Sequence, residues 1–219
     1  MENLLAETEA KLKVVESNVV FDFDMTLINP DTTLGFFIFE QFWTRKFFIF
    51  MHYCLLAILR RMGIITVEQV KLHLLNYWYG QESSPALVEK GVRYAKTLKL
   101  NGLECVLSEE LSRKDSKVWI VTASLDIWVE PLFGSMDVAI LASSVHKNAR
   151  GRWFFLTHCY GDAKAVALKA KGVMALDRVY IDGFSDSPLV NMAAEWHGVR
   201  HGRVVKVGRG LITFESWAK

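Results

Sequence analysis

Short apolar runs rich in β-branched and aromatic residues alternate along the chain with longer segments whose apolar residues recur every three or four positions. The short runs are typical of β-strands, and the longer segments have the period of amphipathic helices. Strands separated by helices usually pair in parallel and are covered on both faces. The pattern therefore predicts an α/β fold with a Rossmann-like, three-layer parallel sheet, whose strands lie at 18–22, 117–121, 137–142, 178–182 and 204–207.

A long stretch between the first two predicted strands has helical periodicity and little β character, as in TVEQVKLHLLNYW and PALVEKGVRYAKTL. It predicts a helical cap inserted after the first strand. We expect residues 1–31 and 98–219 to form an α/β catalytic core and residues 32–97 to form the cap. The segment 148–152, NARGR, carries turn chemistry between two apolar runs and predicts a hairpin added to the sheet.

Composition and charge narrow the class of protein. The 219 residues are enough to bury a hydrophobic core, and a formal net charge of +2 is too balanced to favour a nucleic-acid partner. Three widely separated cysteines indicate neither a disulfide framework nor a zinc site. The N-terminal stretch MENLLAETEAKLKVVES lacks the apolar run of a secretory signal, so we expect a cytoplasmic location.

Acidic and hydroxyl side chains follow three of the predicted strands. Asp22 closes the first strand and Asp24 lies two residues later, Thr122 follows the second strand, and Asp182 closes the fourth with Asp186 just beyond it. Each residue alone is ordinary at a strand end, where turns and helix caps favour such side chains. Ligands of open α/β sheets bind at the carboxyl ends of the strands, so we expect these residues to converge on one edge.

These residues lie in four ordered motifs by which the chain resembles the haloacid dehalogenase-like superfamily, in the branch of phosphoserine phosphatases and phosphatidylglycerophosphatase C-like enzymes. The motifs are DFDMT, WIVTAS with Thr122, CYGDAK ending in Lys164, and IDGFSDSPLV with Asp182 and Asp186. A helical cap between the first and second motifs also fits this family. Met25 stands where glycine is commonest, but this departure removes no reactive group.

The resemblance implies a phosphatase that acts through an aspartyl-phosphate intermediate. Asp22 would be the nucleophile, and Asp24 would serve as general acid and then general base. Thr122 and Lys164 would bind the phosphate, and Lys164 would also offset charge on the nucleophile. Thr26 would contribute to this loop, orienting it through a local hydrogen bond.

Magnesium is the cofactor that the resemblance implies. Asp22 and Asp182 would ligate it directly, Asp24 would contribute its backbone carbonyl, and Asp186 would contact the metal's waters or orient Lys164. Carboxylate and carbonyl oxygens are the ligands that this hard cation prefers.

Some of these residues also fit simpler roles. Lys164 fits a solvated helix face, and Asp186 fits a turn or helix start. Thr122 and Ser124 each offer a hydroxyl, and the sequence leaves open which one binds phosphate. His158 stands beside a cysteine, but adjacent side chains on an extended chain point apart, so we expect no metal there.

The cap is the segment expected to select the substrate. Asp31 occupies the place where phosphoserine phosphatases carry a glutamate that contacts the substrate amine, which is a weak indication for phosphoserine. An apolar residue of VKLHLLNYW stands where those enzymes present an arginine. Residues 45–61, RKFFIFMHYCLLAILRR, have an apolar run too short to cross a membrane and basic pairs at both ends. This run fits an interfacial helix, the buried core of the cap or a dimer contact.

We therefore predict a magnesium-dependent phosphomonoester hydrolase that acts on a lipid phosphate such as phosphatidylglycerophosphate. It would contact the cytoplasmic face of a membrane peripherally through residues 45–61. Two alternatives remain open: a soluble phosphatase for a small metabolite such as phosphoserine or a sugar phosphate, and a non-catalytic interaction module that docks through its apolar cap. The sequence leaves the oligomeric state unspecified.

Overall fold

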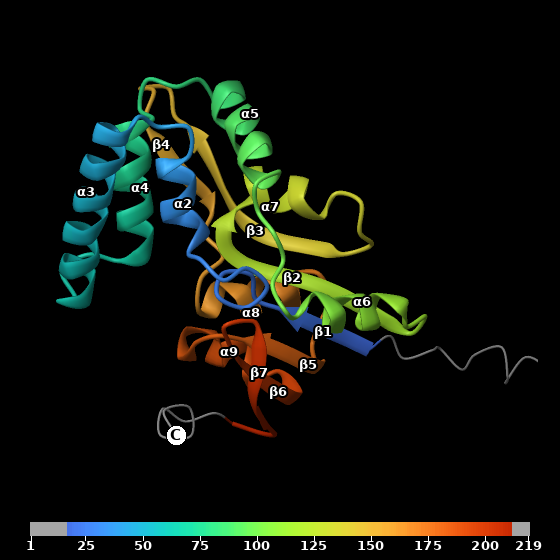
Figure 1. The fold of residues 1–219 in the computed structure, drawn as a ribbon. Coiled ribbons are helices and arrows are strands. Elements are labelled where there is room, and N and C mark those ends of the chain that lie inside the picture. The colour runs from blue at the N-terminus through green and yellow to red at the C-terminus, as the bar shows by residue number, and fades with distance from the viewer. Residues whose placement is uncertain (1–16, 212–219) are drawn as a thin grey trace, which may run out of the picture.

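The computed structural model describes residues 17–211, and most of the N-terminal stretch on which the expectation about secretion rests lies outside this range. A seven-stranded sheet in the order β4-β3-β2-β1-β5-β6-β7 forms the centre of the fold (Figure 1). All neighbouring strands pair in parallel except β3 with β4 and β6 with β7. The strands are β1 (Ser17–Phe21), β2 (Ser116–Leu125), β3 (Ala139–Lys147), β4 (Trp153–Thr157), β5 (Leu176–Ile181), β6 (Ala193–Arg200) and β7 (Arg203–Gly208).

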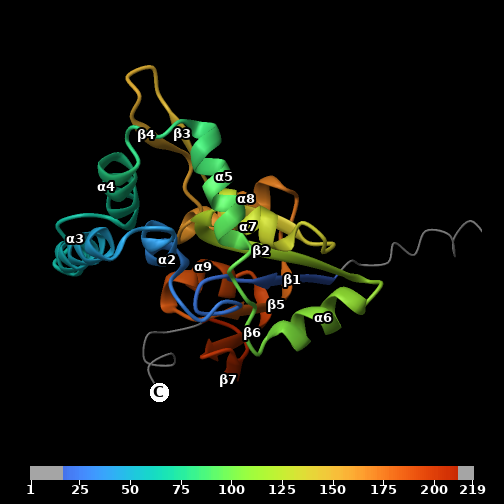
Figure 2. The ribbon, with the colours of Figure 1, turned by 45° about the horizontal axis from the view of Figure 1, so that its top comes forward.

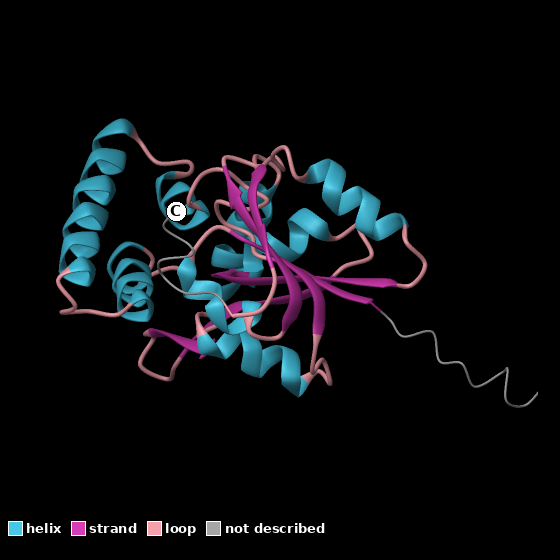
Figure 3. Cartoon of the chain, turned by 90° about the horizontal axis from the view of Figure 1, so that it is seen from below, coloured by secondary structure: helices cyan, strands magenta, loops and turns pink. Residues whose placement is uncertain are grey.

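Helices connect the strands and cover both faces of the sheet, as the view in Figure 3 shows. Helices α2 to α6 all lie between β1 and β2 in the chain, and the others follow β2 or precede β6. They are α2 (Thr32–Ile38), α3 (Trp43–Arg61), α4 (Val67–Trp78), α5 (Ser84–Ala95), α6 (Glu104–Ser112), α7 (Asp126–Phe133), α8 (Asp162–Ala170), the 3-10 turn η1 (Phe184–Asp186) and α9 (Ser187–Val190).

The central strand β1 is buried on both faces. Val19 and Phe21 belong to one hydrophobic cluster, and Val20 between them belongs to another. The first cluster includes Trp128 of α7, whereas the second includes Leu168 of α8. Successive side chains of a strand point to opposite faces, so an almost continuous apolar run places β1 in the middle of three layers. The predicted α/β class, with a mostly parallel sheet between helices, is confirmed.

The helical insertion, α2 to α5, stands at the carboxyl end of β1 and shares its core with the sheet. Phe36 of α2 stacks on Trp128 of α7, with ring centroids 4.7 Å apart. Both rings belong to the cluster that contains Phe21 of β1. The β3–β4 hairpin, predicted from its turn residues, projects toward the insertion (Figure 2), where the Trp153 indole donates to the backbone oxygen of Tyr79 at 2.8 Å.

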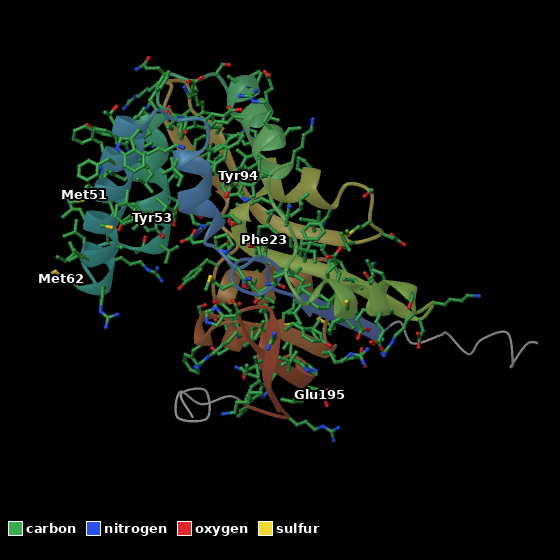
Figure 4. All side chains as sticks on the ribbon, in the orientation of Figure 1. Phe23, Met51, Tyr53, Met62, Tyr94 and Glu195 are labelled. Carbon is green, nitrogen blue, oxygen red and sulfur yellow. The ribbon has the colours of Figure 1, made fainter. Side chains whose placement is uncertain are left out.

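Helix α3 is the outermost element of the insertion, and it packs through one narrow face. Ile49 and Leu56 are its buried residues. The opposite face is apolar and exposed, and Figure 4 shows Met51 and Met62, at the end of the helix, on that outward side. The exposed large apolar residues of this segment are Phe42, Trp43, Phe47, Phe48, Phe50, Met51, Leu55, Ile58 and Met62, and we call them the α3 face.

The apolar run of residues 47–59 is therefore not the buried core of the cap. No helix among residues 17–211 is long and apolar enough to cross a membrane. Strand β6 was missed by the sequence reasoning, because its segment AAEWHGVR mixes glutamate, histidine and glycine with few β-branched residues. It forms in the structure because its backbone pairs with both β5 and β7.

Candidate functional site

Three carboxylates and one ammonium group meet at the carboxyl ends of β1 and β5. Asp22 follows β1 directly, Asp182 follows β5, and Asp186 ends the 3-10 turn after it. One carboxylate oxygen from each lies within 4.8 Å of the other two. Lys164 of α8 donates to Asp22 Oδ1 at 2.6 Å and forms an ion pair with Asp186 Oδ1 at 2.7 Å. The structure thus brings together four predicted site residues that lie far apart in the chain.

The charges in this cluster do not balance. Three carboxylates face a single ammonium, and Asp22, Asp186 and Lys164 are each 5% exposed or less. Burial raises the pKa of Asp22 to about 6 although Lys164 opposes it, and burial with repulsion from Asp22 raises the pKa of Asp182 to about 7. A divalent cation bound through carboxylate oxygens would neutralise the excess charge, so the donor set fits Mg²⁺.

Lys164 is held as a cation by its two neighbours. Burial by itself would lower the pKa of Lys164, but Asp186 and Asp22 outweigh it and raise this pKa above its ordinary value. A charged lysine at this place lies against the nucleophile predicted from the sequence. The solvated helix face considered for Lys164 does not apply, because its side chain is 3% exposed.

Asp24 takes part in a different set of hydrogen bonds. Its Oδ1 accepts from the Thr32 backbone N–H at 2.8 Å, and its Oδ2 accepts from the Ser124 hydroxyl. The Trp128 indole donates to Thr32 Oγ1 at 3.2 Å, and Thr32 Oγ1 lies 2.9 Å from Ser124 Oγ. The indole N–H can only donate, and the Ser124 hydroxyl gives its proton to Asp24. The Thr32 hydroxyl therefore accepts from Trp128 and donates to Ser124.

The surroundings of Asp24 act on its pKa in both directions. Burial and the nearby Asp31 carboxylate raise it, while the hydrogen bonds from Ser124 and Thr32 lower it, and the net effect is an increase. A carboxyl whose pKa is raised toward neutrality is suited to give and take a proton near physiological pH.

Thr122 and Ser124 lie within the last residues of β2, because this strand continues to Leu125 and does not end before Thr122 as the sequence predicted. Their hydroxyl groups have different surroundings. Ser124 donates to Asp24, whereas Thr122 Oγ1 accepts from the Ser124 backbone N–H at 2.9 Å. The Thr122 proton therefore stays available for another acceptor. Thr26 is fully buried, and within the described residues its hydroxyl has no hydrogen-bond partner, so the local hydrogen bond expected of it is not formed. Its loop is held instead through the Thr26 backbone oxygen, which accepts from Asn101 Nδ2 at 2.6 Å.

Asp31 is used by the insertion itself. Its Oδ1 accepts from the Thr33 backbone N–H at 2.8 Å and caps α2, and its Oδ2 accepts from the Tyr53 hydroxyl at 2.5 Å. Both oxygens thus have partners that fix α2 and α3. Contact of Asp31 with a substrate amine stays a prediction, and these bonds give it a second role that the sequence did not indicate.

Sequence reasoning missed Lys71 of α4. Its side chain reaches from the insertion to the carboxyl end of β2, where Nζ donates to the Ala123 backbone oxygen at 2.6 Å. Lys71 is 8% exposed. A single lysine in an amphipathic helical segment usually lies in solvent, so the only available signal was its place among the apolar residues of VKLHLLNYW.

Comparisons with known proteins agree with this architecture. A structure titled as a phosphoserine phosphohydrolase-like protein from Francisella tularensis subsp. tularensis SCHU S4 is similar at a TM-score of 0.59 and 21% identity, with 83% of this chain and 86% of that chain covered. A phosphoserine phosphatase described as a phospho-aspartyl intermediate analogue reaches 0.58 at 19% identity, with 84% and 86% covered. A protein of unknown function from Bordetella pertussis Tohama I reaches 0.62 at 19% identity, with 80% and 86% covered.

At such low sequence identity, the three structures show that the fold is similar and nothing more. A search of curated protein sequences found no match. The family comparison is more specific: the sequence pattern of the haloacid dehalogenase-like hydrolases matches residues 19–189, which include every residue of the acidic cluster and Lys164. The resemblance deduced from the four motifs is confirmed, and the chain belongs to the haloacid dehalogenase-like hydrolases.

Proposed function

We propose that this hydrolase is a phosphatase that cleaves phosphomonoesters through a covalent aspartyl-phosphate. The observation that carries the proposal is the buried Asp22 carboxylate, paired with Lys164 inside a cluster of three acids. One Asp22 oxygen would form the bond to phosphorus while the bond from phosphorus to the ester oxygen breaks. A carboxylate nucleophile divides the hydrolysis into two easier steps.

Other residues of the site would take the remaining tasks. Asp24 would give a proton to the leaving oxygen and later take one from the water that hydrolyses the intermediate. Thr122, whose hydroxyl proton is not used by Ser124, would donate to a phosphoryl oxygen. Lys164 would offset negative charge on the transferring group without having to move, since Asp22 and Asp186 already hold it.

Magnesium is part of this proposal. Asp22, Asp182 and Asp186 would hold it through carboxylate oxygens, with the Asp24 backbone carbonyl as a further ligand. When bound, it supplies positive charge that offsets the phosphate dianion and the carboxylates. The acidic cluster with its buried lysine, in a chain that belongs to the haloacid dehalogenase-like hydrolases, supports phosphate esters as the substrate class.

The test is hydrolysis of p-nitrophenyl phosphate by the purified protein with Mg²⁺ and with excess chelator. We expect turnover only with the metal, and we expect Asp22→Asn to abolish it. Asp24→Asn should slow turnover by roughly a hundredfold, the usual scale for a lost general acid. Asp137→Asn, which removes an exposed acid on another loop, is the control. Full activity in chelator, or near-normal turnover by Asp22→Asn, would contradict the mechanism.

A lipid phosphate is the substrate class that the α3 face favours. Large exposed apolar patches on soluble domains are uncommon and mark contact sites. Phe48 is 62% exposed and Ile58 is 57% exposed, on a helix that contains no acidic residue. Aromatic residues are abundant on this face, as they are at membrane interfaces.

Basic residues at both ends of α3 add charge complementarity to an anionic membrane. Lys46 lines a cavity of about 300 Å³ together with Trp43, Phe47 and Phe50, so its side chain lies beside apolar residues. Arg60 and Arg61 lie in the last turn. Each basic residue near an acidic lipid surface contributes about 1 kcal/mol. We propose that α3 lies in the interface of the cytoplasmic leaflet and presents the active site to a phosphorylated lipid.

Flotation with vesicles that contain phosphatidylglycerol tests this part. The intact protein should float, whereas Phe47→Glu/Phe50→Glu should stay in solution. Val205→Glu/Val207→Glu is the matched control, because it adds the same charge at two exposed apolar positions of β7. Phosphatidylglycerophosphate hydrolysis should follow flotation. If the intact protein stays off the vesicles and prefers a water-soluble phosphate, the lipid proposal fails and the soluble alternative takes its place.

A further inference from the structure

Two buried lysines reach the candidate site from different elements. Lys164 comes from the core helix α8 and is paired with two carboxylates. Lys71 comes from α4 of the insertion, and its Nζ donates to the backbone oxygen of Ala123, the residue between Thr122 and Ser124. Lys71 is therefore anchored directly beside the hydroxyl that we propose to bind phosphate.

The ammonium of Lys71 is buried without an acidic partner. Lys71 is 8% exposed. Within residues 17–211, no carboxylate oxygen lies within 4.0 Å of its Nζ. One backbone carbonyl satisfies one of its three N–H groups. A buried charge is costly unless it is paired, and a paired anion is the usual compensation. The site thus holds an ammonium group that has no carboxylate partner among residues 17–211.

The position of Lys71 indicates which part of a substrate it would meet. Lys71 Nζ is bonded to the backbone oxygen of Ala123, and the next residue, Ser124, donates its hydroxyl to Asp24 Oδ2. The ammonium thus lies on the side of the general acid, where the leaving oxygen and the alcohol attached to it would sit. Lys164, which is bonded to Asp22, would already serve the nucleophile and the phosphoryl group in the proposed mechanism.

We propose that Lys71 binds a second anionic group of the substrate, located on the alcohol side of the phosphate ester, and so makes the enzyme selective for phosphomonoesters that carry such a group. This inference rests on the proposed phosphatase function and names its substrate class more closely. The group would be a carboxylate or a phosphodiester. A carboxylate would come from a small metabolite, and a phosphodiester would come from a lipid headgroup; both offer the same singly charged oxygen acceptor.

Substrates matched in shape test the proposal. Glycerol 3-phosphate and 3-phosphoglycerate differ in one group, an alcohol in place of a carboxylate, and phosphatidylglycerophosphate in mixed micelles supplies the phosphodiester. We compare kcat/KM for the three in the wild type, Lys71→Met, Lys71→Arg and Lys90→Met. Lys90 is the matched control, because it is also 8% exposed and donates to a single backbone oxygen, that of Phe39, at 2.7 Å.

The wild type should prefer one or both anionic substrates over glycerol 3-phosphate. Lys71→Met should reduce that preference by about 10- to 100-fold, the range of a hydrogen bond to a charged group. Lys71→Arg should keep most of the preference, and Lys90→Met should keep all of it. The anionic substrate that loses more in Lys71→Met identifies the source of the group.

Other results overturn the inference in distinguishable ways. An equal loss on all three substrates in Lys71→Met, with an unchanged urea midpoint, would place Lys71 at the phosphoryl group instead. An unchanged preference would make it a structural residue. No turnover of any substrate by the wild type would refute the proposed function together with this inference.

Discussion

Replacing Asp22 by asparagine should stabilise the metal-free protein while it abolishes activity. Asp22 is 5% exposed and shares one ammonium, that of Lys164, with Asp186. Its ionisation in the folded protein is unfavourable, because burial raises the pKa and Lys164 only partly compensates. Asparagine keeps the shape and an oxygen that can accept from Lys164, but it removes the charge.

The magnitude follows from the pKa. Burial raises the pKa of Asp22 from an ordinary value of 3.8 to about 6. The folded state therefore binds this proton more tightly than the unfolded chain, so the carboxyl costs nothing below about pH 3.8 and its full penalty is present above about pH 6. The full penalty corresponds to about 3 kcal/mol, at 1.36 kcal/mol per pKa unit. At pH 5 about half of it should remain.

Urea unfolding in excess chelator measures this effect. Asp22→Asn should exceed the wild type in free energy of unfolding by up to about 3 kcal/mol at pH 8, and by about half of that at pH 5. Asp137→Asn should change it little at either pH, since Asp137 is exposed. Mg²⁺ at a thousandfold excess over its Kd should reverse the order, because it adds about 4.1 kcal/mol to the protein that binds it, which is more than the penalty at Asp22.

One result would refute the reasoning on repulsion. If Asp22→Asn is no more stable than the wild type at pH 8 without metal, the ion pair between Asp22 and Lys164 outweighs the cost of burying the Asp22 carboxylate. An advantage that is the same at pH 5 and pH 8 would show that the gain comes from something other than the charge of Asp22. Neither result would affect the role of Asp22 as nucleophile, which the activity assay tests separately.

Two further substitutions test other parts of the structure. Burial lowers the pKa of His158 to about 4, and its Nε2 has no hydrogen-bond partner in the described chain, so the fold should lose stability as the pH falls from about 6.5 to 4. His158→Gln should remove about 1–2 kcal/mol of that loss, a value that allows for the partly exposed ring. Urea titrations of both proteins at pH 7 and pH 4.5 measure it, and an identical pH dependence in the two proteins would contradict the prediction. Gly91 of α5 packs so closely on α7 that a Cβ would lie 2.4 Å from the Ile127 backbone oxygen. Gly91→Ala should therefore lower the free energy of unfolding by about 1–3 kcal/mol, and an unchanged urea midpoint would show that the two helices separate freely.

The alternation of short apolar runs with helical segments was enough to predict the sheet, its helical layers and the inserted helices. Burial on both faces requires the buried part of a central strand to be apolar throughout, and in β1 this part is Val19, Val20 and Phe21. Asp22 and Asp182 were also found from sequence, because both directly follow strands. Even Met25 in the position of a typical glycine carried structural information, since its φ of 60° lies in the left-handed region that glycine favours.

The sequence alone could not tell what each polar side chain contacts. Asp24 and Asp31 are seven residues apart and both acidic, yet one accepts from Ser124 across the site and the other from Tyr53 of α3. Lys71 was overlooked because its burial results from the insertion folding back onto the carboxyl end of β2, which brings it to a residue 52 positions away. Such partners are set by long-range packing, and no local pattern encodes them.

The same limit applies to the long apolar helix. The composition of α3 fits a buried core helix and an interfacial helix equally well, because hydrophobicity measures a preference to leave water and does not identify what covers the surface. The tertiary structure decided that only Ile49 and Leu56 of α3 are buried, since α2 and α4 cover a single narrow face of it. The chain by itself determined its elements and the reactive residues at the strand ends. Only the tertiary structure decided their partners and which apolar side chains remained exposed, because both depend on which distant segments fill the neighbouring space.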